Sequence, residues 1–544
     1  MNGHVRVRSL IFLLGFALAV LLGYWLATTA APRQARRGPD RSAEPPPRHI
    51  MADDAMPKFR RGEREPGRWR DSEAAAAGAL EGQRVLVFKD QAALARFLEL
   101  AGDKLRLLGR LDALHALRVG FADAAELAGL LNGEAELSLI FPVSIPTPVE
   151  GTVQPGAVAL GNHLLEWLGV TGDNSAWGAG VRIAILDTGV AASSAFGSKI
   201  TRFNLVDLPA DLSQQNGHGT AVASMIIGRD ALTPGVAPGA EILSYRIADD
   251  NGQSDNFLLS QAIVAAVDAG AKLINISMGG TSDSALMQSA IAYAAEHGVL
   301  IIAAAGNYGT NQISHPAANA GVIAVGSVDG LGNHLDFSDS GDQLDLTAPG
   351  YGLNAAWTGE QAVSVSGTSF SAPIVTGLIA AVMTEGGAGG LTQAQAYQML
   401  LAYLDDGGAA GKDPQLGAGM TDMGRVLNGT TPGIYDAAVA SSRILAPDAG
   451  NPYGQVEVLV QNRGTETLIN TAVKVSVGGG TVTANLTSLA PDAVQTVRVP
   501  LTQPAAAYTN GIRVDSRVSL SGGIQDAKSS NDHRVETYVA PAAK

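Results

Sequence analysis

The stretch "VRIAILDTGV" (residues 181–190) predicts a β-strand that is apolar on both faces and ends in a polar loop. Four stretches of the same kind follow along the chain: EILSYRI (241–247), KLINIS (272–277), VLIIAAA (299–305) and GVIAVGSV (321–328). Helical patterns separate them: GTAVASMII (219–227), NFLLSQAIVAAVDAG (256–270) and SALMQSAIAYAAEHG (284–298). Apolar strands that alternate with helices predict an α/β domain, with a mostly parallel sheet that helices cover on both faces.

Different patterns flank this region on both sides. Before it, residues 83–145 show the order β-α-β-β-α-β, which is typical of a small α+β, ferredoxin-like domain. After GTTPG (429–433), short runs of alternating apolar and polar residues are broken by Gly and Pro, which predicts an immunoglobulin-like β-sandwich. We therefore expect three globular domains, at residues 79–147, 148–430 and 431–544.

The amino terminus carries an export or membrane-insertion signal. A nearly uninterrupted apolar run from Leu10 to Leu26 follows two arginines, and small residues extend it to Ala31. Residues 1–31 are therefore either a cleaved signal peptide or a membrane anchor through residues 10–31. We favour the anchor, because Pro32 spoils cleavage after Ala31, although three arginines soon after it oppose an outside orientation of the body. Residues 32–78, rich in Arg and Pro, predict a disordered linker.

The composition argues against several classes of function. The net charge is −14, and the first 71 residues hold 13 Lys and Arg against 7 Asp and Glu, so the globular remainder is strongly acidic. An acidic globular part argues against nucleic acid as a partner. The chain has no cysteine, which excludes a disulfide framework, a thiolate nucleophile and a Cys-based zinc site.

Four polar side chains stand where loops are expected to carry chemistry. Asp187 and Asn307 each follow a buried strand, at the sheet edge where ligands bind. His218 opens a helix between two glycines, and Ser369 lies at the start of another helix. Taken singly, each is explained as an ordinary turn, loop or cap residue. Together they supply a carboxylate, an oxyanion donor, a base and a nucleophile.

The segments that contain these residues resemble the subtilisin-like serine proteases. The resemblance covers residues 160–428 and is carried by five blocks: ILDTGV (185–190), NGHGTAVAS (216–224), INISMGG (274–280), AAAGN (303–307) and GTSFSAP (367–373). The order Asp, His, Ser is also that of the family. The resemblance implies a subtilisin-like fold and an Asp-His-Ser triad.

The resemblance also implies the catalytic roles. Ser369 would attack the scissile carbonyl, His218 would accept its proton and then return it, and Asp187 would fix the imidazole tautomer. Asn307 and the backbone N–H of Ser369 would hold the oxyanion.

A further part of the resemblance concerns substrate binding. Ser277, Met278 and Gly279 would form the strand edge that pairs with an extended peptide substrate. We expect a neutral or apolar side chain before the cut bond. The chemistry requires no cofactor. The family often binds structural calcium, but the acidic loop ADDNGQSDN (248–256) lacks a full ligand spacing, so we expect a solvated turn there and leave any metal ligands unknown.

The flanking domains also resemble known modules. The domain at 79–147 is similar in position and pattern to the propeptides of this family, which inhibit by lying across the active site. Maturation would then cut between Ile145 and Trp167. The carboxyl-terminal domain resembles the bacterial CARDB sandwich in VQNRGTETL (460–468) and SSNDHR (529–534). Its role is either binding of a substrate or surface, or that of a stabilising spacer.

The sequence thus predicts an exported serine endopeptidase, made as a self-inhibited precursor, that cuts peptides or proteins in the cell envelope or outside the cell. One alternative is a catalytically silent binding protein of the envelope. The presence of all four catalytic residues disfavours it. Esterase or transpeptidase activity stays open, because the sequence does not reveal which nucleophile resolves the acyl-enzyme.

Overall fold

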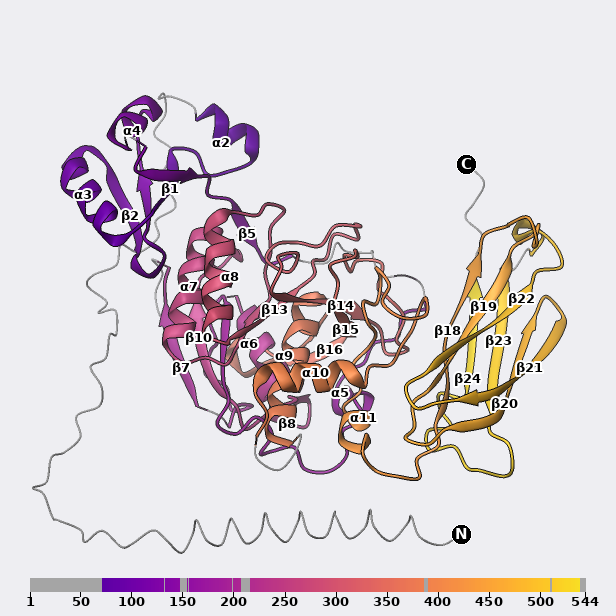
Figure 1. Cartoon of the computed structure of the whole chain (residues 1–544). Coiled ribbons are helices and arrows are strands. Elements are labelled where there is room, and N and C mark those ends of the chain that lie inside the picture. Colours follow the sequence, from indigo (N-terminus) through magenta and orange to yellow (C-terminus); the bar gives the residue numbers. More distant parts are fainter. Residues whose placement is uncertain are drawn as a thin grey trace, which may run out of the picture. The chain divides into compact units, whose positions relative to one another are not determined.

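The computed structural model describes residues 71–131, 133–146, 154, 156–197, 199–206, 216–385, 390–508 and 511–538 (Figure 1). The predicted anchor (1–31) and all but the end of the predicted linker (32–78) lie outside these residues. Within them, one helix, α9 (Thr368–Glu385), is long and apolar enough to cross a membrane, and 83% of it is buried inside the protein. That burial is typical of the core helix of a globular domain.

A seven-stranded parallel sheet forms the centre of the chain, in the order β15-β14-β13-β12-β6-β10-β7. The α/β class and the parallel sheet predicted from the sequence are confirmed. The strands are β6 (Arg182–Asp187), β7 (Ile200–Asn204), β10 (Glu241–Arg246), β12 (Leu273–Ile276), β13 (Leu300–Ala304), β14 (Val322–Val328) and β15 (Leu346–Pro349).

Both faces of the sheet are covered because successive strand residues point to opposite sides. In β6, Ile183 and Ile185 belong to the core that contains α6 and α9, whereas Ala184 and Leu186 belong to the core that contains α7 and α8. The helices of the domain are α5 (Leu164–Trp167), α6 (His218–Ile227), α7 (Asn256–Asp268), α8 (Ala285–Glu296), α9, α10 (Gln393–Ala402) and α11 (Met423–Asn428). Short antiparallel pairs complete it: β8 (Arg229–Asp230) with β9 (Thr233–Pro234), β16 (Leu353–Ala356) with β17 (Ala362–Val365), and β11 (Gln253–Asp255) with β5 (Pro142–Ser144).

A small unit precedes the catalytic domain and has its own antiparallel sheet, in the order β2-β3-β1-β4. Its elements are α2 (Ser72–Ala77), β1 (Gln83–Phe88), α3 (Gln91–Ala101), β2 (Arg106–Leu111), β3 (Ala116–Gly120), α4 (Ala124–Leu131) and β4 (Ala135–Ser138). From β1 to β4 this is the order β-α-β-β-α-β. Asp71 caps α2 and pairs with the buried Arg84 of β1 at 2.5 Å, so the unit extends back to Asp71.

One face of this small sheet packs against α7 of the catalytic domain. Val85 of β1 shares a core with Phe257 of α7. Gly109 of β2 leaves room for the Phe257 ring, because a Cβ at that position would lie 2.5 Å from a ring carbon. Arg118 of β3 forms a buried ion pair of 2.8 Å with Asp255, the N-cap residue of α7. Apolar packing and one buried ion pair therefore hold the unit in place.

The last part of the chain forms two antiparallel sheets around a separate apolar core. One sheet has the order β18-β19-β22 and the other has the order β21-β20-β23-β24. The strands are β18 (Ala437–Leu445), β19 (Gln455–Asn462), β20 (Leu468–Val477), β21 (Gly480–Leu489), β22 (Val494–Pro500), β23 (Ile512–Ser519) and β24 (His533–Tyr538). A core of Val and Leu side chains between two sheets is the arrangement of a β-sandwich.

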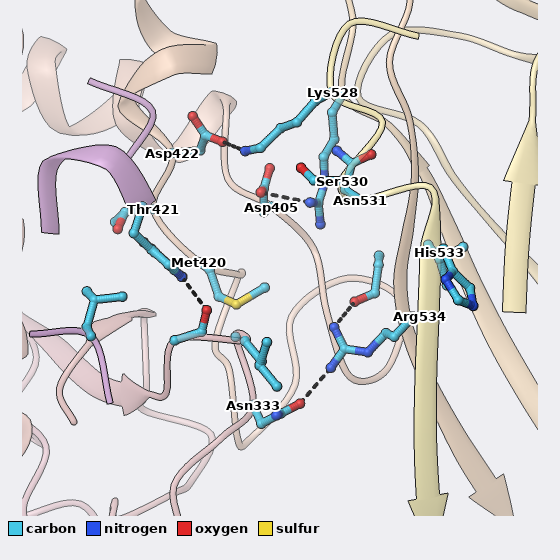
Figure 2. A pocket seen from close by; sticks show the side chains of 18 of the residues that line it. Asn333, Asp405, Met420, Thr421, Asp422, Lys528, Ser530, Asn531, His533 and Arg534 are labelled. Carbon is cyan, nitrogen blue, oxygen red and sulfur yellow. Dashed lines mark hydrogen bonds and ion pairs between the residues drawn. The ribbon is translucent and has the colours of Figure 1, made fainter. Parts of the chain in front are cut away.

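Charged side chains connect the sandwich to the catalytic domain (Figure 2). Lys528 pairs with Asp422 at 3.1 Å, and Arg463 pairs with Asp405 at 2.9 Å. These residues, with Arg534, border a cavity of about 710 Å³. Because the charges around the cavity are paired with one another, we assign it to the connection between the two domains.

The buried helix α9 makes a stability prediction. Leu378 lies in its middle and is completely buried. Leu378→Ala leaves a cavity, so the free energy of unfolding of the catalytic domain should fall by about 2–5 kcal/mol. The measurement is chemical denaturation in a Ser369→Ala background, which prevents self-digestion. Leu232→Ala is the control, because Leu232 is 56% exposed and its loss should cost less than about 0.5 kcal/mol. Equal losses in both variants would contradict the placement of α9.

Candidate active site

The predicted site residues meet at the carboxyl edge of the parallel sheet. Asp187 is the last residue of β6, Ser277 follows β12 directly, and Asn307 follows β13. β12 lies between β6 and β13 in the sheet, so these three strand ends are adjacent. From β6 the chain goes to β7 and then β10 on one side, and later returns to β12 on the other side. Such a reversal of strand order is where ligands bind in α/β sheets.

Asp187 and His218 form a fixed pair. The carboxylate of Asp187 is fully buried, and its two oxygens lie 2.9 and 3.0 Å from Nδ1 of His218. The backbone N–H of Thr188 donates to Asp187 at 2.7 Å, and the hydroxyl of Thr188 accepts the N–H of Gly219 at 3.0 Å. These bonds tie the first turn of α6 to the end of β6. With Nδ1 donating to the carboxylate, Nε2 is the nitrogen left to act as a base.

Ser369 lies in the first turn of α9 and is 1% exposed. Its Oγ donates to the carbonyl oxygen of Ser277 at 3.1 Å, and Oγ of Ser277 donates to the carbonyl oxygen of Ser369 at 2.7 Å. The ring of the next residue, Phe370, is 5.3 Å from the imidazole of His218. Nε2 of His218 is buried and has no hydrogen-bond partner in the described part of the chain. Phe370 thus brings the start of α9 close to His218, while the serine hydroxyl is bonded to Ser277.

Asn307 is oriented as a hydrogen-bond donor. Its Oδ1 accepts both the backbone N–H of Thr368 at 2.9 Å and the hydroxyl of Thr368 at 2.8 Å. Nδ2 therefore points away from α9, and it donates to the carbonyl oxygen of Pro146 at 2.5 Å. The N–H groups in the first turn of α9 have no acceptor within the helix. An oxyanion that develops between Asn307 and α9 would meet Nδ2 of Asn307 on one side and N–H groups of the first turn of α9 on the other.

Two further residues that hold this loop were missed by sequence reasoning. The buried carboxylate of Asp339 accepts the N–H groups of Tyr308 at 3.2 Å and Thr310 at 2.8 Å, and burial raises the pKa of Asp339 above that of an ordinary aspartate. Gly306 has a φ of +119°, and a Cβ there would lie 2.0 Å from Oδ2 of Asp339. The only hint in the sequence was the glycine immediately before Asn307.

A segment of the chain itself pairs with the edge where an extended peptide substrate is expected. Ser144 exchanges two backbone hydrogen bonds of 2.9 Å with Gly279, β5 pairs with β11, and the N–H of Ile145 donates to the carbonyl of Gly252 at 3.0 Å. Residues 142–145 thus lie between two edges of the catalytic domain. Met278 is completely buried beneath one of these edges.

The acidic loop at 248–256 contributes the second edge. Its last part is β11, where Asp255 is fully buried, so the expected solvated turn covers only the beginning of this loop. There, Asp249 accepts backbone N–H groups of the turn, and Asp250 pairs with Arg246. Among the described ranges no group of three or more His, Asp or Glu could hold a metal ion. Ligands for calcium therefore stay unplaced.

Comparison with known proteins places this site in a family context. A family model, described as the subtilase family, matches residues 178–419. Over 215 residues the chain is 35% identical to a thermostable alkaline protease of Halalkalibacterium halodurans, a match that covers 38% of this chain and 58% of that protease. Over 214 residues it is 34% identical to thermitase of Thermoactinomyces vulgaris, which covers 38% of this chain and 77% of thermitase.

A solved structure extends the likeness along the chain. Fervidolysin from Fervidobacterium pennivorans, described as a keratinolytic enzyme related to subtilisin, matches with a TM-score of 0.54 and 21% identity, over 89% of this chain and 79% of that chain. At this identity the likeness concerns the fold alone. With the family match, it confirms the subtilisin-like α/β fold expected from the sequence.

The contact between α6 and β6 makes a prediction about the site. A Cβ on Gly219 would lie 2.4 Å from the carbonyl oxygen of Gly189 and 3.1 Å from Asp187, so Gly219→Ala should move His218 relative to Asp187. We expect the rate of fluorophosphonate labelling of Ser369 to fall about 100-fold with an unchanged circular dichroism spectrum. Gly129→Ala, in α4 and with nothing within 4 Å of the new methyl group, is the control. Normal labelling of the Gly219 variant would contradict this geometry.

Proposed function

The chain belongs to the subtilase family, a family of serine endopeptidases, and we propose that it is an exported member that is made as a self-inhibited precursor. One observation carries the proposal. The carbonyl oxygen of Pro146, at the end of the segment that fills the cleft, lies 2.5 Å from Nδ2 of Asn307, where a substrate carbonyl would be activated. This supports the proposal, because a segment of the chain lies as a substrate would, at the site that Asp187, His218 and Ser369 are proposed to form.

The mechanism follows from the positions of the four groups. Oγ of Ser369 attacks the scissile carbonyl carbon while Nε2 of His218 takes the hydroxyl proton. Asp187 keeps Nδ1 protonated and stabilises the cationic ring. Asn307 and the first turn of α9 hold the oxyanion of the tetrahedral intermediate.

The second half of the reaction returns the enzyme to its starting state. His218 gives its proton to the leaving amine, so the peptide C–N bond breaks and an ester remains on Ser369. Water then attacks the ester with His218 again as the base, which releases the carboxylate product and restores the hydroxyl. None of these steps draws on a metal or cofactor.

Substrate choice follows from the mode of pairing. A peptide must lie extended between β11 and the edge at Ser277 to Gly279, as β5 does, so unfolded chains and exposed loops are better substrates than compact domains. The residue whose carbonyl meets Asn307 is a proline in this structure. This agrees with a neutral or apolar side chain before the cut bond.

The flanking parts fit an exported precursor. We assign the small unit, with its ferredoxin-like order of elements, as a propeptide, because it packs on α7 and sends β5 into the cleft. We assign the sandwich, of immunoglobulin-like and CARDB-like type, as a stabilising domain, because its charged contacts to the catalytic domain are paired. Residues 10–31 would attach the chain to a membrane, or direct its secretion, so that the protease acts in the envelope or outside the cell.

The direct test compares the full chain with Ser369→Ala. The parent should react with a fluorophosphonate probe and show, by intact mass, a cut between Ile145 and Trp167. The Ser369→Ala variant should do neither. A folded parent that takes up no probe would overturn the assignment and restore the silent binding protein. Transfer of the acyl group to added amines, faster than hydrolysis, would favour a transpeptidase.

Removal of the oxyanion donor makes a separate prediction. Asn307→Leu removes the side-chain donor, so kcat on an extended peptide should fall about 10²–10³-fold, the cost known for the equivalent donor in subtilisin, with little change in KM. Asn428→Leu, at the exposed end of α11 and outside both edges of the cleft, is the control and should keep full activity. A loss confined to KM would contradict a role for Asn307 in the transition state.

A further inference from the structure

Pro146 lies at a position of the cleft where the strand pairing calls for an N–H group. In an antiparallel ladder, the pairs of residues that exchange both hydrogen bonds recur at every second residue. Ser144 and Gly279 form such a pair. Two residues further on, residue 146 stands opposite Ser277, so its N–H would donate to the carbonyl oxygen of Ser277. Proline has no N–H and leaves that oxygen without its ladder donor.

The hydroxyl of Ser369 donates to the carbonyl oxygen that the proline leaves without a donor. The carbonyl oxygen of Ser277 accepts the hydroxyl of Ser369 at 3.1 Å. Nε2 of His218, to which this hydroxyl must give its proton, has no partner among the described residues. A carbonyl oxygen cannot serve as the base, so the serine hydroxyl in this arrangement is bonded to Ser277 and not to its base.

We propose that the bond between Pro146 and Thr147 is the processing site of the precursor, and that Pro146 makes its cleavage slow. Because the proline withholds an N–H, the Ser277 carbonyl holds the Ser369 hydroxyl away from His218 and keeps the precursor latent. The inference rests on the proposed function of Ser369 as a nucleophile, and it adds the bond and the device that delays its cleavage.

The position of the carbonyl identifies the bond. Asn307 donates to the oxygen of Pro146, so the carbonyl carbon of Pro146 is the one that Ser369 attacks. The proton of the hydroxyl passes to His218 and then to the nitrogen of Thr147 as the C–N bond breaks. Hydrolysis of the ester leaves a carboxylate on Pro146 and an amine on Thr147. Rotation of the hydroxyl from Ser277 to His218 must come first.

The test separates the effect of the missing N–H from the effect of the proline ring. The full chain is made by cell-free synthesis with alanine at position 146 (Pro146→Ala), or with N-methylalanine at the same position. Both lack the proline ring, but only alanine carries an N–H. Self-cleavage is followed in time by intact mass, and the new amino terminus is sequenced. Ser369→Ala is the control for cleavage by other proteases, and fluorophosphonate labelling reports the nucleophile in every variant.

We expect Pro146→Ala to cut itself at least about fivefold faster than the parent, because one hydrogen bond is gained in the productive complex and the nucleophile is released. The N-methylalanine variant should stay as slow as the parent, and each mature chain should begin at Thr147.

Three results would overturn the inference in distinguishable ways. Equal rates for alanine and N-methylalanine, with Ser369-dependent cleavage intact, would reject the role of the N–H while the protease assignment stands. A mature chain that begins at another residue would reject the assigned bond. If no variant is cut and none takes up the probe, the proposed function fails as well.

Discussion

Thr368, at the start of α9, donates two hydrogen bonds to Asn307, and the side chain of Ser277 donates to the carbonyl of Ser369. These bonds fix the first turn of a buried helix to the ends of β13 and β12. Since α9 is packed inside the core along most of its length, it cannot shift without repacking that core. Ser369, Asn307 and the edge at Ser277 therefore keep one mutual geometry.

The same geometry explains why the cleft accepts a peptide only as a strand. Gly279 and Gly252 present backbone groups to β5, and the side chains of the bound segment contribute shape. Recognition through the main chain is indifferent to most sequences, so selectivity comes from the side chain before the cut bond and from positions where a residue changes the hydrogen bonding. Pro146 is such a position, because its ring removes a donor that every other residue would supply.

The parts of the site that could be predicted from the sequence are those that depend on local signals. Asp187 and Asn307 end strands that are apolar on both faces, and His218 and Ser369 begin helices, so each could be placed at the sheet edge before any contact was known. β5 and β11 could not be predicted, because each is three residues long and their pairing joins distant segments. Asp339 was missed for a similar reason, since its partners are backbone groups of a remote loop.

The buried ion pair between Arg118 and Asp255 holds the small unit on the catalytic domain, and it bears on the rate of the proposed activation. While the chain is intact, the small unit faces its docking site at an effective concentration set by the short connection. Once the connection is cut, the same contacts must hold a separate molecule, whose occupancy depends on dilution. The proposed activation would then have two rates, one for the cut and one for dissociation of the small unit, and crowding at a surface would slow only the second.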